Sequence, residues 1–383
     1  MTKAHLAMLD AETKKLEQAG LYRPETIHAA NKNMVDFTSQ DFLGLARDGR
    51  LVAAAKLALD KHGLGSGSRA FSGTRQIHQE LEQALAKFLD VPAAIVFGSG
   101  YLANLALYNA LFDSRDCLFC DNLVHPSTAE GVMLSSATTF PYRNADLEDL
   151  EDKLKRSRSA RFRAVITDGV FPFDGRVAEL GALCELAQRY EAMVVVDDSL
   201  GIGVLGQTGR GTREVRGVMG QVDLVTGSLG KALGSAGGFV AGKREVVEWL
   251  RQKATPYLFS AALSPASAST ALKAIELVQK KEAPLDRLRV RVAEVKLALE
   301  GKGFRVLGGD HPSLAVYVGG VVKLQKLVTS LYERGVHVNG VCYPVVPEGE
   351  ARVRLDVTAL HTDADLELAL YALDQAGRSL GIL

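Results

Sequence analysis

The sequence contains few cysteines and no excess charge of either sign. Its 383 residues include four cysteines, too few for a disulfide framework in a chain of this length. Lys and Arg number 45, as do Asp and Glu, so the net charge is zero and gives no support to nucleic-acid binding. The N-terminal sequence MTKAHLAMLDAETKK lacks the apolar run of a signal peptide. We therefore expect a cytoplasmic protein that binds neither nucleic acid nor a membrane.

Long uninterrupted hydrophobic runs are also missing. Residues 91–112 carry no charge over a length that could cross a membrane, but Pro92, Gly98, Gly100 and two asparagines interrupt them. We expect a strand, a turn and a buried helix there. With 47% hydrophobic and 23% charged residues, the composition is that of a globular protein with room for two or three domains.

Strands and helices alternate through the first two thirds of the chain. Short apolar runs bounded by turn residues predict buried strands, with helical patterns before and between them at 51–62, 76–89, 147–156 and 179–190. The predicted strands are AAIVF, CLFC, AVITDGVF, MVVVDD, DLVTGS and GFVAG. This alternation predicts an α/β fold with a mostly parallel sheet that helices cover on both faces.

The two ends of the chain depart from this pattern. Leu6, Leu9 and Leu16 lie at helical spacing and predict an amphipathic N-terminal helix. We expect it to end at Gly20 and to dock on a larger body. One long helical pattern covers residues 264–301, after which SLAVYVGG, VHVNGVCYPVVP and ARVRLDVTA predict strands of a smaller α+β unit closed by a final helix. The expected divisions are an N-terminal arm at 1–45, a large domain at 46–280 and a small domain at 281–383.

Two short motifs suggest sites that the surrounding sequence does not support. Gly201, Gly203 and Gly206 form a GxGxxG after a strand. They continue into more loop, whereas a dinucleotide site needs the last glycine to open a helix. Cys117 and Cys120 form a CxxC without the second pair or nearby histidine that a zinc site requires. We expect core cysteines and no bound metal.

Lys231 differs from a typical surface lysine because it lies among small residues in GSLGKALGSAGG, directly after a predicted strand. It is either a loop lysine that reaches solvent or a partly desolvated amine that can form a Schiff base with an aldehyde. Ser228, three residues earlier, can offer a hydroxyl to a phosphate. Asp197 ends another strand, where open α/β sheets place their ligands, although turn capping explains an isolated aspartate equally well.

Several segments together resemble one family. They are DFLGL, GSGSRAFSGTRQIHQELE, FGSGYLAN, LVHPSTAEG, TDGVFPFDG, VVVDDSLGIGVLGQTGRG, TGSLGKALG, PYLFSAALSP and YPVVPEGEARVRL. Their order along residues 36–383 resembles that of the α-oxoamine synthases, which are fold-type I pyridoxal-phosphate (PLP) enzymes. The resemblance implies a fold-type I PLP transferase, with a mostly parallel central sheet and a smaller α+β C-terminal domain.

The resemblance implies how the cofactor ring is held. Lys231 matches the lysine that binds PLP as a Schiff base. Asp197 matches the carboxylate facing the pyridine nitrogen, where a negative charge keeps that nitrogen protonated and lets the ring act as an electron sink. His125, in HPSTAEG, matches the histidine stacked over the ring, although an isolated histidine is more often a satisfied core residue.

The resemblance also implies a phosphate site. Gly100 and Tyr101 fall where a strand gives way to a helix, so their N–H groups can point at the phosphate with the helix dipole behind them. Ser228 adds a hydroxyl. Ser260 matches a phosphate contact that the family supplies from the neighbouring subunit, which implies a homodimer with sites at the subunit interface.

The substrate site combines one match with three departures from the family pattern. Arg354 matches the arginine that binds the substrate's α-carboxylate, whereas Arg352 is the better candidate for an exposed strand-edge charge. Gln40 replaces an asparagine near the substrate carboxylate. Pro172 and Leu200 replace a serine and a histidine that approach the phenolic oxygen of the cofactor. Two polar groups at that oxygen are therefore replaced by apolar ones.

The activity implied by the resemblance is condensation of a small amino acid, glycine first, with an acyl thioester to give an α-amino ketone or β-keto amino acid. The acyl chain, its carrier (coenzyme A or a carrier protein) and the fate of the carboxylate stay open. The replaced polar pair keeps another PLP carbanion reaction as an alternative, such as aldol cleavage, decarboxylation or transamination. A third alternative is a non-catalytic partner subunit, which the retained Lys231 and Asp197 disfavour.

Overall fold

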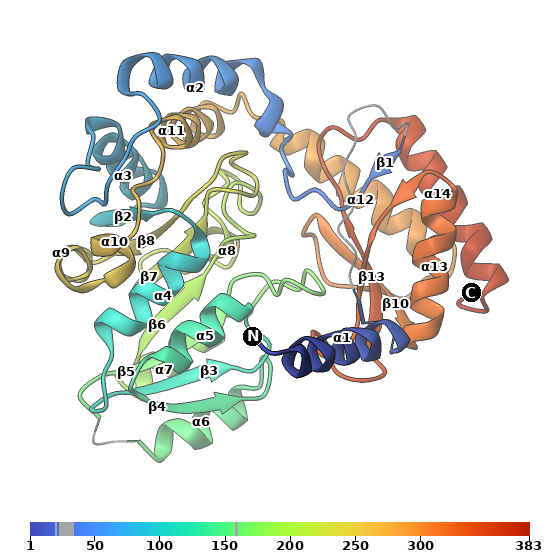
Figure 1. Ribbon diagram of the computed structural model, residues 1–383, viewed down its shortest axis with the longest axis horizontal. Coiled ribbons are helices and arrows are strands. Elements are labelled where there is room, and N and C mark those ends of the chain that lie inside the picture. The colour runs from blue at the N-terminus through green and yellow to red at the C-terminus, as the bar shows by residue number, and fades with distance from the viewer. Residues whose placement is uncertain (20, 23–33, 158–159) are drawn as a thin grey trace.

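Two sheets organise the computed structural model, which describes residues 1–19, 21–22, 34–157 and 160–383. A seven-stranded sheet is built from residues 93–242, and a four-stranded sheet from residues 306–356. Figure 1 shows the two sheets side by side, each with its own helices. Within the described ranges, no helix combines the length and the apolar character needed to cross a membrane.

The seven-stranded sheet is mostly parallel, as predicted. Its order is β2-β8-β7-β6-β5-β3-β4. Strand β8 is antiparallel to both of its neighbours, β2 and β7, and the other neighbouring strands are parallel. The strands are β2 (Ala93–Phe97), β3 (Cys117–Asp121), β4 (Thr138–Tyr142), β5 (Arg163–Asp168), β6 (Met193–Asp197), β7 (Leu224–Ser228) and β8 (Gly238–Gly242). The sequence did not predict β4, because this edge strand, TTFPY, is mostly exposed and lacks an apolar run.

Alternate residues of a strand in this sheet face two different cores. In β2, Ile95 and Phe97 pack into one core, while Ala94 and Val96 pack into the other. Helices on both faces close these cores, as predicted (Figure 1). They are α2 (Gly49–His62), α3 (Gln76–Leu89), α4 (Gly100–Leu111), α5 (Pro126–Leu134), α6 (Leu147–Lys155), α7 (Leu180–Arg189), α8 (Thr212–Val215), α9 (Arg244–Lys253), α10 (Thr255–Phe259) and α11 (Pro265–Gln279).

The four-stranded sheet is antiparallel throughout, in the order β12-β13-β10-β9. A short parallel pair also joins β1, from the N-terminal segment, to β11. The strand β1, which precedes the short 3-10 helix η1 (Leu45–Arg47), therefore lies with the C-terminal part. The strands are β1 (Val35–Asp36), β9 (Val306–Leu307), β10 (Ser313–Gly319), β11 (Val336–His337), β12 (Asn339–Val341) and β13 (Ala351–Asp356), and the helices are α12 (Leu285–Gly301), α13 (Val321–Glu333) and α14 (Asp363–Ser379).

The prediction of one helical stretch over residues 264–301 is wrong. Helix α11 ends at Gln279, and α12 begins at Leu285. Lys281 between them has a φ of 58°, outside the right-handed helical region, and Pro284 stands directly before α12. The apolar periodicity continues across this break because both helices bury a face in the same core.

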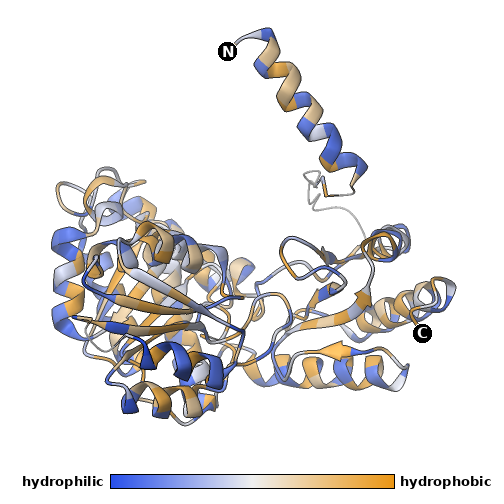
Figure 2. Ribbon diagram, turned by 90° about the horizontal axis from the view of Figure 1, so that it is seen from below, coloured by the Kyte–Doolittle hydropathy of each residue, from blue (hydrophilic) through white to orange (hydrophobic). Residues whose placement is uncertain are grey.

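The N-terminal helix α1 (Lys3–Gln18) forms as predicted, but it does not pack on the rest of the chain that the structure describes. Leu6, Leu9 and Leu16 are 55%, 51% and 48% exposed, and no residue of the helix is buried. Figure 2 shows the helix standing clear of the rest of the chain. Its predicted end at Gly20 lies outside the described residues.

Candidate active site

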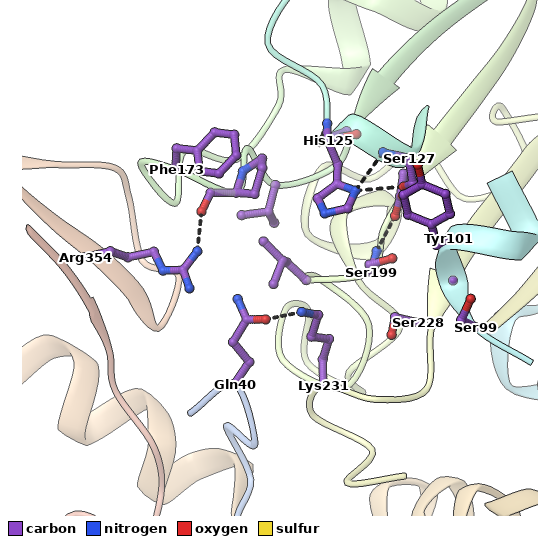
Figure 3. A pocket seen from close by; sticks show the side chains of 16 residues that line it. Gln40, Ser99, Tyr101, His125, Ser127, Phe173, Ser199, Ser228, Lys231 and Arg354 are labelled. Carbon is purple, nitrogen blue, oxygen red and sulfur yellow. Dashed lines mark hydrogen bonds between the residues drawn. The ribbon is translucent and has the colours of Figure 1, made fainter. Parts of the chain in front are cut away.

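One cavity of about 320 Å³ gathers the predicted site residues, with Ser260 as the exception. It opens at the carboxyl ends of β5, β6 and β7, where open α/β sheets place their ligands. Figure 3 shows side chains from both sheets converging on it. Six further lining residues were not predicted: Ser99, Ser127, Asp168, Val170, Phe173 and Ser199.

The start of α4 lies at one end of this cavity. Ser99 caps the helix, since its Oγ accepts a hydrogen bond of 3.1 Å from the amide of Leu102. Gly100 and Ser228 lie so close that a Cβ on Gly100 would meet the Cβ of Ser228 at 3.2 Å. Gly238 allows this approach, because a Cβ there would lie 2.3 Å from the nitrogen of Gly100. Helix amides beside a serine hydroxyl suit a phosphate group.

Asp197 is fixed through both of its carboxylate oxygens at the end of β6. Oδ2 accepts a hydrogen bond of 2.7 Å from Asn104 Nδ2, and Oδ1 accepts one of 3.0 Å from the amide of Ser199. The residue is 6% exposed. A buried, oriented carboxylate of this kind fits a protonated pyridine nitrogen, as PLP requires. Asn104 lies on α4 and was not predicted as a site residue, although it is the last residue of the FGSGYLAN segment.

Asp168 lies beside Asp197 and was missed. It ends β5, in direct register with Asp197 on β6, and its Oδ2 accepts a hydrogen bond of 2.8 Å from the amide of His125. Burial, together with the negative charge of Asp197, raises the pKa of Asp168 well above its usual value. The predicted strand AVITDGVF continues past Asp168, whereas β5 ends at this residue, and this difference hid it as a site residue.

His125 is the N-cap residue of α5, and its ring is open to the cavity. Its Nδ1 accepts a hydrogen bond of 3.2 Å from the amide of Ser127 and lies 2.7 Å from the Ser127 Oγ. The proton of the neutral ring is therefore on Nε2. Desolvation by the surrounding protein lowers the pKa of His125, and the positive charge of Lys231 adds to this while Asp197 opposes it. A neutral, oriented ring is suited to stacking on a planar cofactor.

Lys231 reaches into the cavity from the loop between β7 and β8. Its Nζ donates a hydrogen bond to Oε1 of Gln40, as Figure 3 shows. Burial lowers the pKa of Lys231, and nearby Arg354 lowers it further, against the opposing charges of Asp356 and Asp197. A lowered pKa increases the fraction of free amine, the form that reacts with an aldehyde.

Arg354 lines the cavity from β13, and Figure 3 shows Gln40 between it and Lys231. Its side chain is 14% exposed. The expectation for Arg352 is wrong: it is 6% exposed rather than a free strand-edge charge. Its guanidinium binds the carbonyl of Glu350 at 2.8 Å and lies 3.9 Å from a carboxylate oxygen of Asp174. The loop at 172–175 covers this face of the small sheet, which local sequence does not reveal.

Pro172 and Leu200 both line the cavity with apolar side chains. Their backbone carbonyls are held from the other sheet. Arg354 Nη1 donates a hydrogen bond of 3.1 Å to the carbonyl of Pro172, and His311 Nε2 lies 3.0 Å from the carbonyl of Leu200. These contacts position both loops whatever their side chains are.

The remaining predicted features lie elsewhere. Ser260 follows α10 and does not line the cavity that the described residues form. The glycine motif at 201–206 lies in a loop, and the next helix, α8, begins at Thr212. The last glycine therefore does not open a helix, as expected from the sequence. Cys117 and Cys120 lie on β3 and pack with the two cores, as predicted.

The amine of Lys231 suits the aldehyde of PLP, and the buried carboxylate of Asp197 suits its pyridine nitrogen. Comparisons with known proteins agree. The family model described as aminotransferase class I and II matches residues 32–373. The 2-amino-3-ketobutyrate coenzyme A ligase of Escherichia coli K12 is 41% identical, with 98% of this chain and 97% of the relative covered. The 8-amino-7-oxononanoate synthase of Thermosipho melanesiensis is 40% identical over 92% of this chain and 90% of the relative.

Solved structures are similar over nearly the whole chain. Serine palmitoyltransferase from S. paucimobilis, with a bound PLP–myriocin aldimine, has a TM-score of 0.93 and 29% identity, covering 99% of each chain. The chain therefore belongs to the aminotransferase class I and II family, as a PLP-dependent acyltransferase of the α-oxoamine synthase type with the fold-type I architecture.

Proposed function

We propose that this enzyme condenses glycine with an acyl-CoA, acetyl-CoA first. The observation that carries the proposal is that one cavity is lined by both the amine of Lys231 and the guanidinium of Arg354, with Gln40 between them. The name of the Escherichia coli relative adds support, because 2-amino-3-ketobutyrate is the amino acid that glycine and an acetyl group form.

Each residue has one task in this proposal. Arg354 binds the α-carboxylate through its guanidinium fork, and Gln40 helps to orient the amino acid beside Lys231. PLP, when bound, supplies an electron-withdrawing ring that acidifies the α-carbon of the amino acid. Its phosphate would lie at Ser99, Gly100 and Ser228, and its pyridine nitrogen at Asp197.

Lys231 then acts as the proton acceptor. With the carboxylate held by Arg354, the Nζ of Lys231 removes the α-proton, and the α-carbon bonds to the acyl carbonyl while the thiolate leaves and takes up a proton. The His125 ring would cover one face of the cofactor ring. The apolar side chains of Pro172 and Leu200 keep water from that region.

The same two apolar side chains support a second candidate. They remove the side-chain donors expected at the phenolic oxygen, so the alternative is another PLP carbanion reaction on the same scaffold, with its own amino-acid substrate, such as aldol cleavage, decarboxylation or transamination. Release of free thiol distinguishes the two, because only acyl transfer expels one.

The test is a thiol-release assay on the PLP-loaded enzyme with each common amino acid and a series of acyl-CoAs. Glycine with acetyl-CoA is expected to give the fastest release, and Lys231→Ala to abolish it. Thiol release with another amino acid or a longer acyl chain would correct the substrate. Amino-acid-dependent absorbance changes without thiol release would favour the second candidate, and no response to any amino acid would favour a non-catalytic subunit.

We also propose a homodimer in which Ser260 contacts the phosphate bound by the neighbouring chain. Its position outside the cavity of its own chain supports this assignment. The expected divisions of the chain at 45 and 280 are part of the same proposal. Light scattering is expected to give twice 41.1 kDa, and Ser260→Ala to weaken PLP retention. A fully active monomer would contradict both.

A further inference from the structure

Asp356 is a fully buried carboxylate, 0% exposed, that has no task in the function proposed above. It ends β13, two residues after Arg354, and alternate residues of a strand face the same side. In the antiparallel pairing of β13 with β10, Asp356 is opposite Ser313 and Arg354 is opposite Ala315. The strand therefore brings the carboxylate and the guanidinium to one face, next to a serine.

The contacts of Asp356 run toward the cavity. Ser313 Oγ donates a hydrogen bond of 2.6 Å to Asp356 Oδ1. Asp356 Oδ2 lies 3.0 Å from Arg354 Nη2, an ion pair without the alignment of a hydrogen bond. On its other side, the Arg354 guanidinium donates through Nη1 to the carbonyl of Pro172 at 3.1 Å. The guanidinium is thus held at two nitrogens.

Several of the five N–H donors of this guanidinium make no hydrogen bond to the described residues. Arg354 Nε is buried and makes no hydrogen bond to any residue that the structure describes. The arginine is therefore arranged with two contacts that fix it and donor capacity left for a ligand.

A long arginine side chain loses much rotational freedom when it binds a ligand, and a side chain that is already fixed avoids this loss. The cavity end of β13 provides such fixing, because Ser313 orients Asp356 and Asp356 faces the guanidinium. The amide of Asp356 also donates a hydrogen bond of 2.8 Å to the carbonyl of Phe37, in the segment that leads to Gln40. The strand end is consequently tied to a second wall of the cavity.

We propose that Asp356 is a positioning residue that holds Arg354 in the orientation needed for the substrate's α-carboxylate, with Ser313 orienting Asp356 in turn. The proposal rests on the proposed role of Arg354. It differs from a plain counter-ion role, in which Asp356 only neutralises a buried charge. A counter-ion affects folding stability alone, whereas a positioning residue affects the selectivity for a carboxylate ligand.

The experiment compares glycine with glycinamide, which has the same amine and lacks the carboxylate. Binding of each to the PLP-loaded enzyme is measured by equilibrium dialysis without acyl donor, and thermal stability is measured in parallel. Asp356→Asn keeps the shape and an acceptor for Ser313 but removes the charge. It is expected to weaken glycine binding about tenfold, the effect of one charge-assisted contact, and to leave glycinamide binding within about twofold.

Asp116→Asn is the matched control. Asp116 is also a buried aspartate, 1% exposed, paired with an arginine, Arg161, at 2.6 Å. It lies directly before β3, at the end of the sheet opposite the cavity. Its substitution is expected to lower stability without changing the preference for glycine over glycinamide.

Three results are decisive. If Asp356→Asn lowers stability but leaves the preference for glycine unchanged, the positioning role is refuted. If Asp356→Asn does not fold, Ser313→Ala replaces it, with an expected loss of about threefold in glycine binding alone, and an unchanged preference again refutes the proposal. If Arg354→Lys itself leaves the preference unchanged, the carboxylate site of the proposed function is wrong instead.

Discussion

Exchanging Arg354 and Arg352 for lysine, one at a time, tests the substrate site most directly. Both arginines lie on β13, but Arg354 lines the cavity while Arg352 is buried against Glu350 and Asp174. Lysine keeps the positive charge beside Asp356 and loses the planar fork. We expect Arg354→Lys to weaken glycine binding, and Arg352→Lys to lower stability without changing glycine affinity.

The magnitude follows from the contacts of Arg354. Its side chain is 14% exposed, so solvent screens a bound carboxylate only weakly. A hydrogen bond to a charged group contributes about 1.5–3 kcal/mol, and an arginine makes two to a carboxylate where a lysine makes one. Loss of one such bond predicts roughly 10- to 150-fold weaker binding of glycine.

Equilibrium dialysis with labelled glycine, in the absence of acyl donor, measures this affinity, and the absorbance of bound PLP confirms that the cofactor is retained. Thermal unfolding of the same samples gives the stability. Equal weakening of glycine binding in both variants, or no weakening in either, would show that Arg354 is not the carboxylate ligand.

Three further predictions concern other parts of the site. Borohydride reduction of the PLP-loaded enzyme, followed by peptide mapping, should label Lys231, and a label on another lysine would overturn its assignment. Pro172→Ser combined with Leu200→His should shift the pH titration of the cofactor absorbance to lower pH and raise glycine-dependent thiol release, and no change in either would make both departures neutral. Burial lowers the pKa of the His311 imidazole from 6.5 to about 4. As the pH falls below 6.5, this imidazole therefore binds a proton in the unfolded chain before it does so in the folded chain. The contribution of His311 to the free energy of unfolding is present above pH 6.5 and is lost as the pH falls through 4. This loss amounts to about 3 kcal/mol. In urea unfolding of His311→Gln, the free energy of unfolding should therefore decrease less between pH 6.5 and 4 than it does in the wild type. An equal decrease in both proteins would refute this role of His311.

Much of the fold could be predicted because local patterns carry it. Apolar runs with turn residues located most strands of the large sheet, and the predicted helices at 51–62 and 76–89 match α2 and α3 closely. Two errors have a common origin. The edge strand β4 lacks an apolar run, and the break between α11 and α12 keeps the apolar period, so pattern and structure differ at both places.

The site residues likewise include some that local sequence predicts and some that it does not. Lys231 and Asp197 could be predicted because each lies at or just after the end of a predicted strand, whereas the predicted strand AVITDGVF continues past Asp168, where β5 ends. Arg352 could not be assigned correctly from β13 alone. Alternation places it on the same face as Arg354, but only the loop carrying Asp174, from a distant part of the chain, determines that this face is covered.

Pro172 and Leu200 show why a comparison of side chains gives only part of a site. The sequence indicates two lost donors at the phenolic oxygen, yet the loops that carry these residues are fixed by their carbonyls, which every residue type has. Arg354 and His311 hold them from the small sheet, so an apolar substitution changes the polarity of the cavity without releasing the loops. Tolerance at these two positions therefore follows from the backbone contacts, and any effect on the reaction must come from the missing side-chain donors themselves.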